Sequence, residues 1–237
     1  MSAITEAAFA DAQEQELHNW EGHTGNSKRL LYELVEHTSS VEKLRKCVRE
    51  RQHPVEAAVD VGVGCFGLGF LGPHLADLCD RIDGVDPLPR QTLDPEDEAL
   101  RTYLEAIQNR VNYIQASGES MPFDDATYDL AACINVVDHA RDPVAIVTEI
   151  HRVLKPGGLF AFSVSTLSKA GEWKWKADRS RHPDKWLYRA HPHTYQWQAA
   201  DAMVRSLFPD VVWSDQPSAK NQLIGRGRMS AWIVRKG

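Results

Sequence analysis

The chain lacks any apolar run long enough to span a membrane, and its first residues have neither the basic start nor the apolar middle of a secretion signal. It holds only four cysteines, which are scattered and form no Cys-x-x-Cys pair, so we expect reduced thiols and no zinc site. A basic excess is also missing, because the formal net charge is −6, which argues against a broad nucleic-acid-binding face. These absences predict a cytoplasmic protein without a membrane partner and argue against a nucleic-acid partner, although a local basic patch can override the net charge.

The residues that are present suffice for a sizeable core, since 43% of the 237 residues are hydrophobic and 25% are charged. No internal repeat or low-complexity segment interrupts the chain. Residues 56–237 are predicted to form the main domain, preceded by a helical extension or lid over residues 1–55. Within the extension, Trp20 either covers a bound ligand or anchors its helix to the core. The helices expected there cover residues 6–20, 27–37 and 40–51.

From residue 56 the pattern alternates between short apolar runs and helical segments, which predicts a doubly wound α/β sheet with parallel strands and right-handed crossovers. The expected parallel strands cover residues 57–61, 81–85, 111–116, 128–136 and 159–165. The expected helices between them cover residues 69–79, 94–110 and 142–154. A helix over 194–208 is followed by two strands that are too close for a helical crossover, 211–214 and 230–235. These two strands are predicted to form an antiparallel pair at the sheet edge, so that the sheet has seven strands with an antiparallel last strand.

A glycine-rich turn follows the first predicted strand. Gly62, Gly64 and Gly67 suit a turn that needs unusual backbone angles or the close approach of a ligand. The first amides of the next helix would point back at this turn, as they do in sites for nucleotides and carboxylates. Asp86 lies 19 residues beyond Gly67, at the end of the second strand, where an acid can accept both ribose hydroxyls of an adenosine group. The same spacing describes a nicotinamide dinucleotide site, and a tight turn without a ligand is the structural alternative.

Five segments in order resemble class I S-adenosylmethionine-dependent methyltransferases, especially the small-molecule type similar to methyltransferase type 11. They are Asp60-Val-Gly-Val-Gly64, Gly84-Val-Asp-Pro87 and the stretches over residues 113–130, 135–143 and 149–158. The resemblance covers residues 56–166 and implies a Rossmann-like fold, S-adenosylmethionine as cofactor and a small-molecule methyl acceptor. Two positions depart from the family: Phe66 stands where a third glycine is usual, and Ser117 where an acid near the adenine is often found.

The resemblance also implies roles for residues around the glycine-rich turn. The backbone of Gly62, Val63 and Gly64 would approach the methionine part of the cofactor. Asp60 would orient this turn or accept from the cofactor's ammonium group, and its structural alternative is an acid that closes the loop. Asp86 would bind the ribose hydroxyls.

The remaining contacts implied by the resemblance lie further along the chain. Pro87 would lie beside the ribose, Gly118 and Glu119 would flank the adenine, and the Asn135 carbonyl would help to hold the ammonium group. Asn135 has the alternative of a plain cap at the strand end. His139, just past the fourth strand and near the expected methyl position, is the candidate catalytic base, because its pKa class suits proton transfer near neutrality. Its alternative is to cap the loop.

Residues 167–193 lie where the resembled family inserts substrate-binding segments, and they carry an excess of four positive charges together with three tryptophans. Indole faces stack on planar or cationic groups, and Arg and Lys pair with carboxylates or phosphates. We therefore expect a lid over an anionic or aromatic small molecule, with substrate contacts from Trp173, Arg181, Trp186, Tyr188, Arg189 and His193. A solvated basic loop and an RNA-binding patch are the alternatives. His191-x-His193 lacks a nearby third ligand, so no metal site is predicted.

Three functions stay open at this point. The first is methyl transfer to a small molecule. The second is a nicotinamide-dependent oxidoreductase, which the glycine spacing and Asp86 allow but for which the chain lacks a Tyr-x-x-x-Lys pair. The third is a non-catalytic relative that binds the cofactor or a partner protein. No Asn-Pro-Pro-Tyr-like run follows the fourth strand, which argues against methylation of nucleic-acid amino groups.

Overall fold

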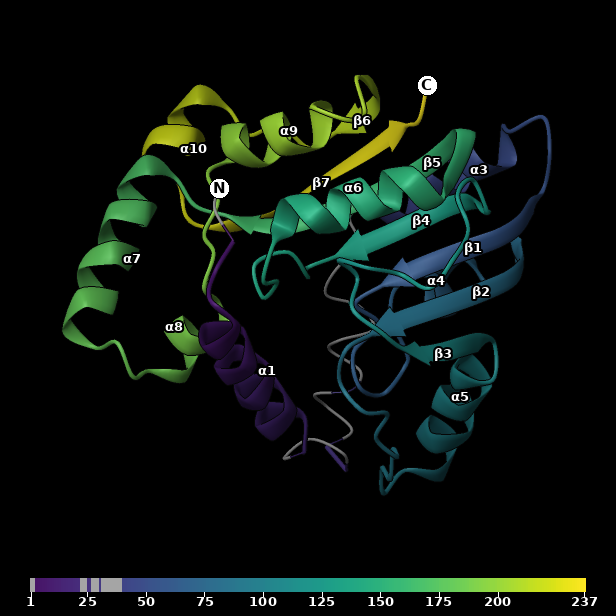
Figure 1. Cartoon of the computed structure of the whole chain (residues 1–237), viewed down its shortest axis with the longest axis horizontal. Helices are drawn as coiled ribbons and strands as arrows, with labels where there is room; N and C mark the ends of the chain where they lie inside the picture. The colour runs from purple at the N-terminus through teal and green to yellow at the C-terminus, as the bar shows by residue number, and fades with distance from the viewer. Residues whose placement is uncertain (1–2, 22–24, 27–29, 31–39) are drawn as a thin grey trace.

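The computed structural model describes residues 3–21, 25–26, 30 and 40–237. Within these residues the centre is a seven-stranded sheet in the order β3-β2-β1-β4-β5-β7-β6 (Figure 1). Strands β1 to β5 pair in parallel, whereas β7 runs antiparallel to both β5 and β6. The fold class predicted from the sequence is therefore confirmed. The strands are β1 (Val55–Val61), β2 (Cys79–Asp86), β3 (Val111–Gln115), β4 (Tyr128–Ile134), β5 (Leu154–Thr166), β6 (Asp210–Ser214) and β7 (Arg228–Arg235).

Helices cover both faces of the sheet (Figure 1). α6 (Pro143–Val153) and α9 (Trp197–Arg205) pack on one face, and α3 (Val41–Arg49) and α4 (Leu71–Leu75) pack on the other. Because successive strand residues point to opposite faces, β4 contributes alternate side chains to the two layers and is buried along its whole length. The other described helices are α1 (Glu6–Glu21), α5 (Glu98–Gln108), α7 (Lys169–Arg181), α8 (Trp186–Ala190) and α10 (Ala219–Ile224). None of the described helices is both long and apolar enough to cross a bilayer.

The sequence predicted an aspartate N-cap for α6 and for α5, and the structure agrees at the first of these two helices. Asp142 caps α6 as predicted, because its carboxylate accepts from the amides of Val144 and Ala145. The predicted start of α5 at residue 94 was wrong. Asp97 is the N-cap and accepts from the Leu100 amide at 2.8 Å, while Asp94 forms an ion pair with Arg101 on the same helix.

Two predicted boundaries were wrong because strand pairing extends further than the local pattern indicates. The helix expected over 69–79 is limited to the five residues of α4, since β2 already begins at Cys79, which pairs with Val55. Residues 155–158, expected to lie between the helix over 142–154 and the strand over 159–165, belong to β5 and form an irregularity in its pairing with β4. α1 and α3 match two of the predicted N-terminal helices, and the third, over 27–37, falls largely outside the described residues.

Candidate active site

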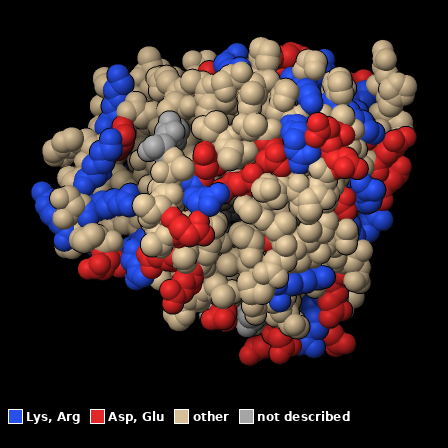
Figure 2. Space-filling model, viewed as in Figure 1, with Lys and Arg blue, Asp and Glu red and all other residues tan. Residues whose placement is uncertain are grey.

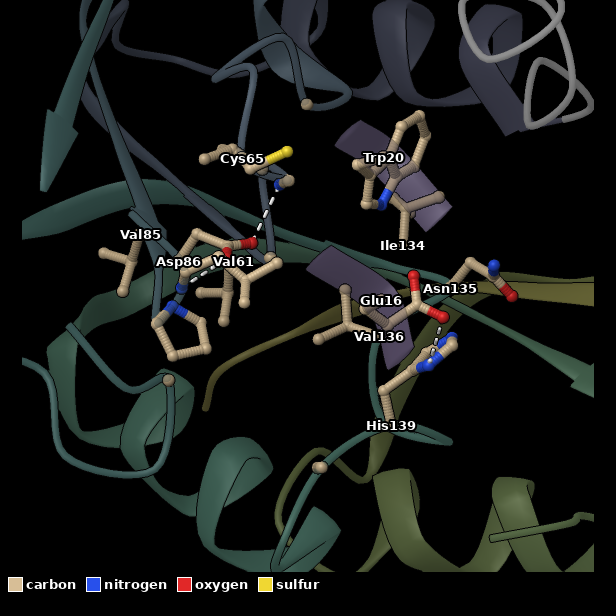
Figure 3. A pocket seen from close by; sticks show the side chains of 18 of the residues that line it. Glu16, Trp20, Val61, Cys65, Val85, Asp86, Ile134, Asn135, Val136 and His139 are labelled. Atoms are coloured by element: carbon tan, nitrogen blue, oxygen red, sulfur yellow. Dashed lines mark hydrogen bonds and ion pairs between the residues drawn. The ribbon is translucent and has the colours of Figure 1, made fainter. Parts of the chain in front are cut away.

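A cavity of about 480 Å³ opens at the carboxyl ends of β1, β2 and β4 (Figure 3). Parallel strands end at the same edge of a sheet, so the glycine-rich turn, Asp86 and Asn135 come together there. A further wall comes from α1, which crosses this edge and carries Glu16 and Trp20 into view in Figure 3. The site therefore combines the rim of the sheet with a helix from the N-terminal extension.

Gly62 and Gly64 of the turn after β1 both have left-handed backbone angles, which favour glycine, but their surroundings differ. At Gly62 (φ +79°) an added Cβ would lie 2.2 Å from a methyl carbon of Val136, so the backbone is both left-handed and crowded. At Gly64 (φ +70°) an added Cβ would meet nothing within 4 Å, because this position faces open space. Gly62, Val63 and Gly64 all line the cavity. The turn thus exposes backbone to the cavity at Gly64.

Asp60 closes the loop that follows this turn. Its Oδ2 accepts from the amides of Phe70 and Leu71, both at 2.7 Å, at the start of α4. The residue is 1% exposed, and burial raises its pKa to about 7 although the two amides lower it. Of the two roles expected for Asp60, the contacts correspond to orientation of the turn.

Asp86 lines the cavity at the end of β2 and is held by two backbone amides. Oδ2 accepts from the Gly64 amide at 2.8 Å, and Oδ1 accepts from the Leu88 amide at 2.9 Å. The residue is 6% exposed, and burial raises its pKa to about 6 against the effect of both amides. Each carboxylate oxygen retains capacity for a further hydrogen bond. The arrangement suits a ligand with two adjacent hydroxyls, and neighbouring Pro87 also lines the cavity.

Gly118 and Glu119 line the cavity between β3 and β4, but the Glu119 carboxylate is engaged elsewhere. Its Oε1 accepts from the Asp142 amide at 2.8 Å, and its Oε2 lies 3.2 Å from Nε of Arg141. An added Cβ on Gly118 would lie 2.6 Å from a Val61 methyl carbon, so the chain here lies close against β1. Glu119 therefore ties this loop to the start of α6.

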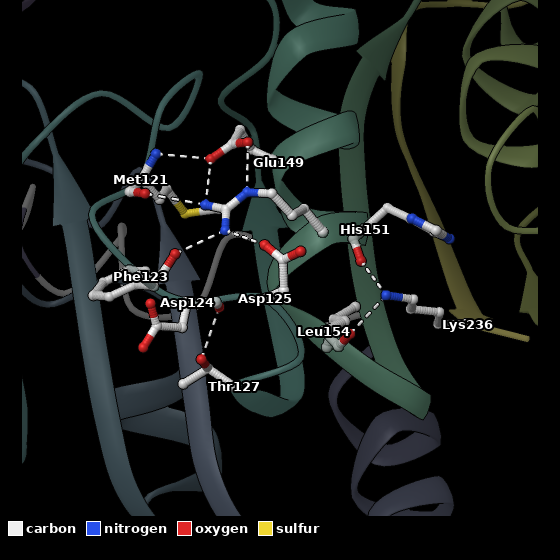
Figure 4. Close-up of polar contacts among 10 residues, drawn as sticks. Met121, Phe123, Asp124, Asp125, Thr127, Glu149, His151, Leu154 and Lys236 are labelled. Carbon is white, nitrogen blue, oxygen red and sulfur yellow. Dashed lines mark hydrogen bonds and ion pairs between the residues drawn. The ribbon is translucent and has the colours of Figure 1, made fainter.

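The loop after Glu119 is fastened by Arg152 of α6, whose partners Met121, Phe123, Asp125 and Glu149 are labelled in Figure 4. Its guanidinium donates to the carbonyls of Phe123 (2.7 Å) and Met121 (3.1 Å) and to the carboxylates of Glu149 and Asp125. Glu149 in turn accepts from the Met121 amide at 2.9 Å. This network holds the edge of the cavity rigidly against α6 without lining it.

Asn135 ends β4 in an unusual backbone conformation. Its φ is +57°, a left-handed angle that Asn tolerates better than most residues, and its amide donates to the Ser163 carbonyl at 3.0 Å. Its Oδ1 is buried and has no hydrogen-bond partner among the described residues. Asn135 also lines the cavity, so its backbone carbonyl remains the group expected to hold an ammonium group there.

His139 lies in the cavity wall within a polar cluster. Its Nδ1 is 3.4 Å from Oε1 of Glu16 (Figure 3), and its Nε2 is 3.8 Å from Oδ1 of Asp138. The His191 ring lies 4.3 Å from the His139 ring, centroid to centroid. Burial, followed by the neighbouring His139, lowers the pKa of His191. The sequence placed His139 correctly at this edge but did not pair it with Glu16 or His191.

Of the six residues expected to contact substrate, Trp186 is placed in the cavity wall. The other five do not line the cavity that the described residues form. Trp173 (71% exposed) and Arg181 lie on α7, where Lys and Arg gather at the left edge of Figure 2. The segment 167–193, expected to form a lid, contains two helices, α7 and α8, and Ser168 caps the first of them by accepting from the Gly171 amide.

The remaining three residues of that set have structural partners. Tyr188 donates to Asp178 of α7, and the buried His193 contacts the Ala140 carbonyl at 2.9 Å through its Nε2. Arg189 donates to Asp11 of α1, with Nε at 2.9 Å from the carboxylate. The placement does not support direct substrate contact for Tyr188, Arg189 or His193.

Helix α1 supplies wall residues that the sequence did not single out, apart from Trp20. α8 holds α1 in place, because Arg189 pairs with Asp11 and Trp186 donates through Nε1 to the Gln15 carbonyl at 3.2 Å. Trp20 packs edge-on against Phe66, with ring centroids 5.5 Å apart, and also lines the cavity. It therefore fits both of its expected alternatives. The newly identified wall residues of α1 are Phe9, Gln13, Glu16 and Asn19.

Known proteins resemble this chain in the region that forms the cavity. Residues 59–162 match the family model described as a methyltransferase domain. A ubiquinone biosynthesis O-methyltransferase of Methylocella silvestris is 28% identical over 151 residues, which cover 62% of this chain and 56% of that protein. An uncharacterized methyltransferase of Mycobacteroides abscessus is 35% identical over 106 residues, which cover 44% of this chain and 38% of that protein. The chain thus spans about half or less of the length of these relatives.

Among solved structures, the Burkholderia thailandensis 1,6-didemethyltoxoflavin-N1-methyltransferase, crystallised with its named substrate and S-adenosylhomocysteine, aligns with a TM-score of 0.62. The alignment covers 100% of this chain and 92% of that protein at 15% sequence identity, which establishes the similarity of fold. The matched residues 59–162 include the glycine-rich turn, Asp86, Gly118, Glu119, Asn135 and His139. The family resemblance of the sequence is confirmed.

Proposed function

We propose, from the match of residues 59–162 to the methyltransferase domain family model, that this protein transfers a methyl group from S-adenosylmethionine to a small-molecule acceptor. The observation that carries the proposal is Asp86, which is held by the amides of Gly64 and Leu88 and faces the cavity beside an open glycine turn. The same arrangement is consistent with the ribose-binding role expected from the sequence.

The residues of the cavity fit the cofactor. Its volume of about 480 Å³ lies within the range of small-molecule sites, roughly 300–1,000 Å³. Asp86 offers acceptor capacity for two ribose hydroxyls, and the carbonyl of Asn135, a residue of the cavity wall, is the proposed acceptor for the ammonium group. The open side of Gly64 permits the backbone to lie against the methionine part.

When bound, S-adenosylmethionine supplies a methyl group that is already activated on a sulfonium. The protein therefore has to orient the acceptor, exclude water and accommodate the proton that an oxygen or nitrogen acceptor loses. Trp20 and Trp186 exclude water from the cavity wall. His139, with Glu16 and Asp138 nearby, is the polar group of the wall at which the proton loss is assisted.

For the acceptor we propose a planar, aromatic compound that is methylated on oxygen. Phe9, Trp20 and Trp186 present aromatic rings to the cavity, and such rings stack on planar groups. The anionic alternative has less support, because Arg189 is neutralised by Asp11 and Arg181 lies outside the cavity. Oxygen as the acceptor atom extends to this chain the activity for which the Methylocella relative is named.

Calorimetric titration with S-adenosylhomocysteine, with NADH in parallel, tests the cofactor. Micromolar binding of S-adenosylhomocysteine alone is expected, and binding of NADH instead would replace the proposal by the oxidoreductase alternative. Turnover of a panel of phenols and catechols, followed by the release of S-adenosylhomocysteine, tests the acceptor. Intact cofactor binding without turnover of any acceptor would favour a non-catalytic relative.

A further inference from the structure

The geometry points to a binding site for a divalent transition-metal cation formed by Asp138, His139 and His191 in the wall of the cavity. The potential ligand atoms of these three residues all lie within 4.8 Å of one another. Nε2 of His139 is 3.8 Å from Oδ1 of Asp138, and Nε2 of His191 is 4.0 Å from Oδ2 of the same carboxylate. Ligand bonds to Zn²⁺ measure about 2.0–2.2 Å, so two ligands of one ion lie roughly 3–4 Å apart. The cluster matches this spacing with small movements of the side chains.

Both imidazoles are oriented so that the nitrogen facing Asp138 can act as a ligand. Nδ1 of His191 lies 2.9 Å from the Leu187 carbonyl. A carbonyl oxygen only accepts hydrogen bonds, so Nδ1 carries the proton and Nε2 of the neutral ring keeps its lone pair. His139 also presents its Nε2 to Asp138, while its Nδ1 lies 3.4 Å from the Glu16 carboxylate without forming a hydrogen bond to it. An outer acceptor on the second ring nitrogen is a regular feature of metal-binding histidines.

Asp138 gives an independent indication. The residue is 3% exposed, and its Oδ1 has no hydrogen-bond partner among the described residues. Burying a carboxylate oxygen without a hydrogen-bond partner is unfavourable, whereas a bound cation would compensate the charge of the carboxylate. Two hydrogen bonds also fix the backbone around Asp138. The Asp138 carbonyl accepts from the His193 amide (3.2 Å), and the Val137 carbonyl accepts from the Tyr195 hydroxyl (3.2 Å).

Two imidazoles and one carboxylate are the donor set of a catalytic type of site, which leaves coordination positions open for other ligands. His139 and His191 both line the cavity, so the open positions face its interior. If the proposed methyl transfer is correct, the cation would face an acceptor oxygen and favour loss of its proton, and His139 would act as a ligand instead of the proton acceptor. This last step depends on the proposed function, whereas the metal site itself does not.

The test is titration of the untagged, chelator-treated full-length protein with Co²⁺, followed by visible absorption and calorimetry, with Mg²⁺ in parallel. We expect one Co²⁺ per chain with visible ligand-field bands and no thiolate charge-transfer band, and no comparable binding of Mg²⁺, which prefers oxygen ligands. Asp138→Asn and His191→Ala are expected to weaken Co²⁺ binding at least tenfold. His182→Ala is the matched control, because Nε2 of His182 also lies 3.8 Å from an aspartate, Asp178, but on the exposed end of α7; its Co²⁺ affinity should be unchanged.

Titration of each variant with S-adenosylhomocysteine shows whether the fold and the cofactor site are intact. Absence of Co²⁺ binding, or binding that Asp138→Asn and His191→Ala do not alter, would overturn the metal site even if S-adenosylhomocysteine still binds. Conversely, if the unaltered protein does not bind S-adenosylhomocysteine, the proposed function is contradicted, whereas the metal site is still decided by the Co²⁺ titration.

Discussion

Asp86→Asn examines the ribose-binding proposal most directly, because it preserves the shape of the side chain and removes its charge. The two amide contacts, at 2.8 and 2.9 Å, use one acceptor position on each oxygen and leave one for each ribose hydroxyl. A hydrogen bond to a charged group contributes about 1.5–3 kcal/mol, so two of them contribute about 3–6 kcal/mol. Asn keeps one acceptor oxygen, and we expect it to lose about half of this, ~1.5–3 kcal/mol, or roughly 10- to 150-fold in Kd for S-adenosylhomocysteine.

The same carboxylate predicts a pH dependence of cofactor binding. Burial raises the pKa of Asp86 to about 6, so the free protein is increasingly protonated below that pH. A protonated carboxyl can no longer accept from both hydroxyls, and the affinity should therefore fall as the pH drops below about 6, by at most about tenfold per pH unit. Asn does not titrate, so the variant should lack this decrease.

Calorimetry with S-adenosylhomocysteine between about pH 5 and pH 8 measures both effects. Asp210→Asn, on the edge strand β6 and outside the cavity, is the control and should behave as the unaltered protein. If Asp86→Asn binds within about threefold of the unaltered protein and keeps its pH profile, the carboxylate does not hold the ribose and the reasoning is refuted.

Three further outcomes follow from the contacts. Burial raises the pKa of Asp60 from 3.8 to about 7, so the folded state favours the protonated carboxyl. The contribution of Asp60 to the unfolding free energy is therefore complete below pH 3.8 and is lost as the pH rises towards 7, by up to ~4 kcal/mol. Asp60→Asn should therefore flatten the decline of the unfolding free energy over this window, and parallel urea-unfolding profiles would contradict this. Arg152→Ala should lower the unfolding free energy by about 2–3 kcal/mol, since it removes donors from the Met121 and Phe123 carbonyls; a change below about 0.5 kcal/mol would contradict the network. Once an acceptor is known, Trp186→Ala should raise its KM by up to about tenfold, whereas the exposed Trp173 should tolerate alanine, and equal effects would argue against Trp186 as a wall residue.

Local sequence determined the framework of this protein. The strand–helix alternation, the glycine-rich turn after β1 and the acid at the end of β2 depend on residues that are close together in the chain. Because parallel strands end at one edge, placing Gly64, Asp86, Asn135 and His139 at that edge required no knowledge of packing. The family resemblance rests on the same local segments.

Only the tertiary structure decided which side chains meet across the cavity. The tryptophans and basic residues of 167–193 look alike in sequence, yet Trp186 lines the cavity, Trp173 is exposed, and Arg189 pairs with Asp11, 178 positions away. The periodicity of a helix shows which of its faces is apolar but not which element that face packs against. The sequence therefore could not predict that α1 forms a wall of the cavity. The ligands of the proposed metal site show the same limit. Asp138 and His139 lie more than fifty residues before His191, and they come within 4.8 Å of it because the loop after β4 contacts the segment after α8, where the His193 amide donates to the Asp138 carbonyl.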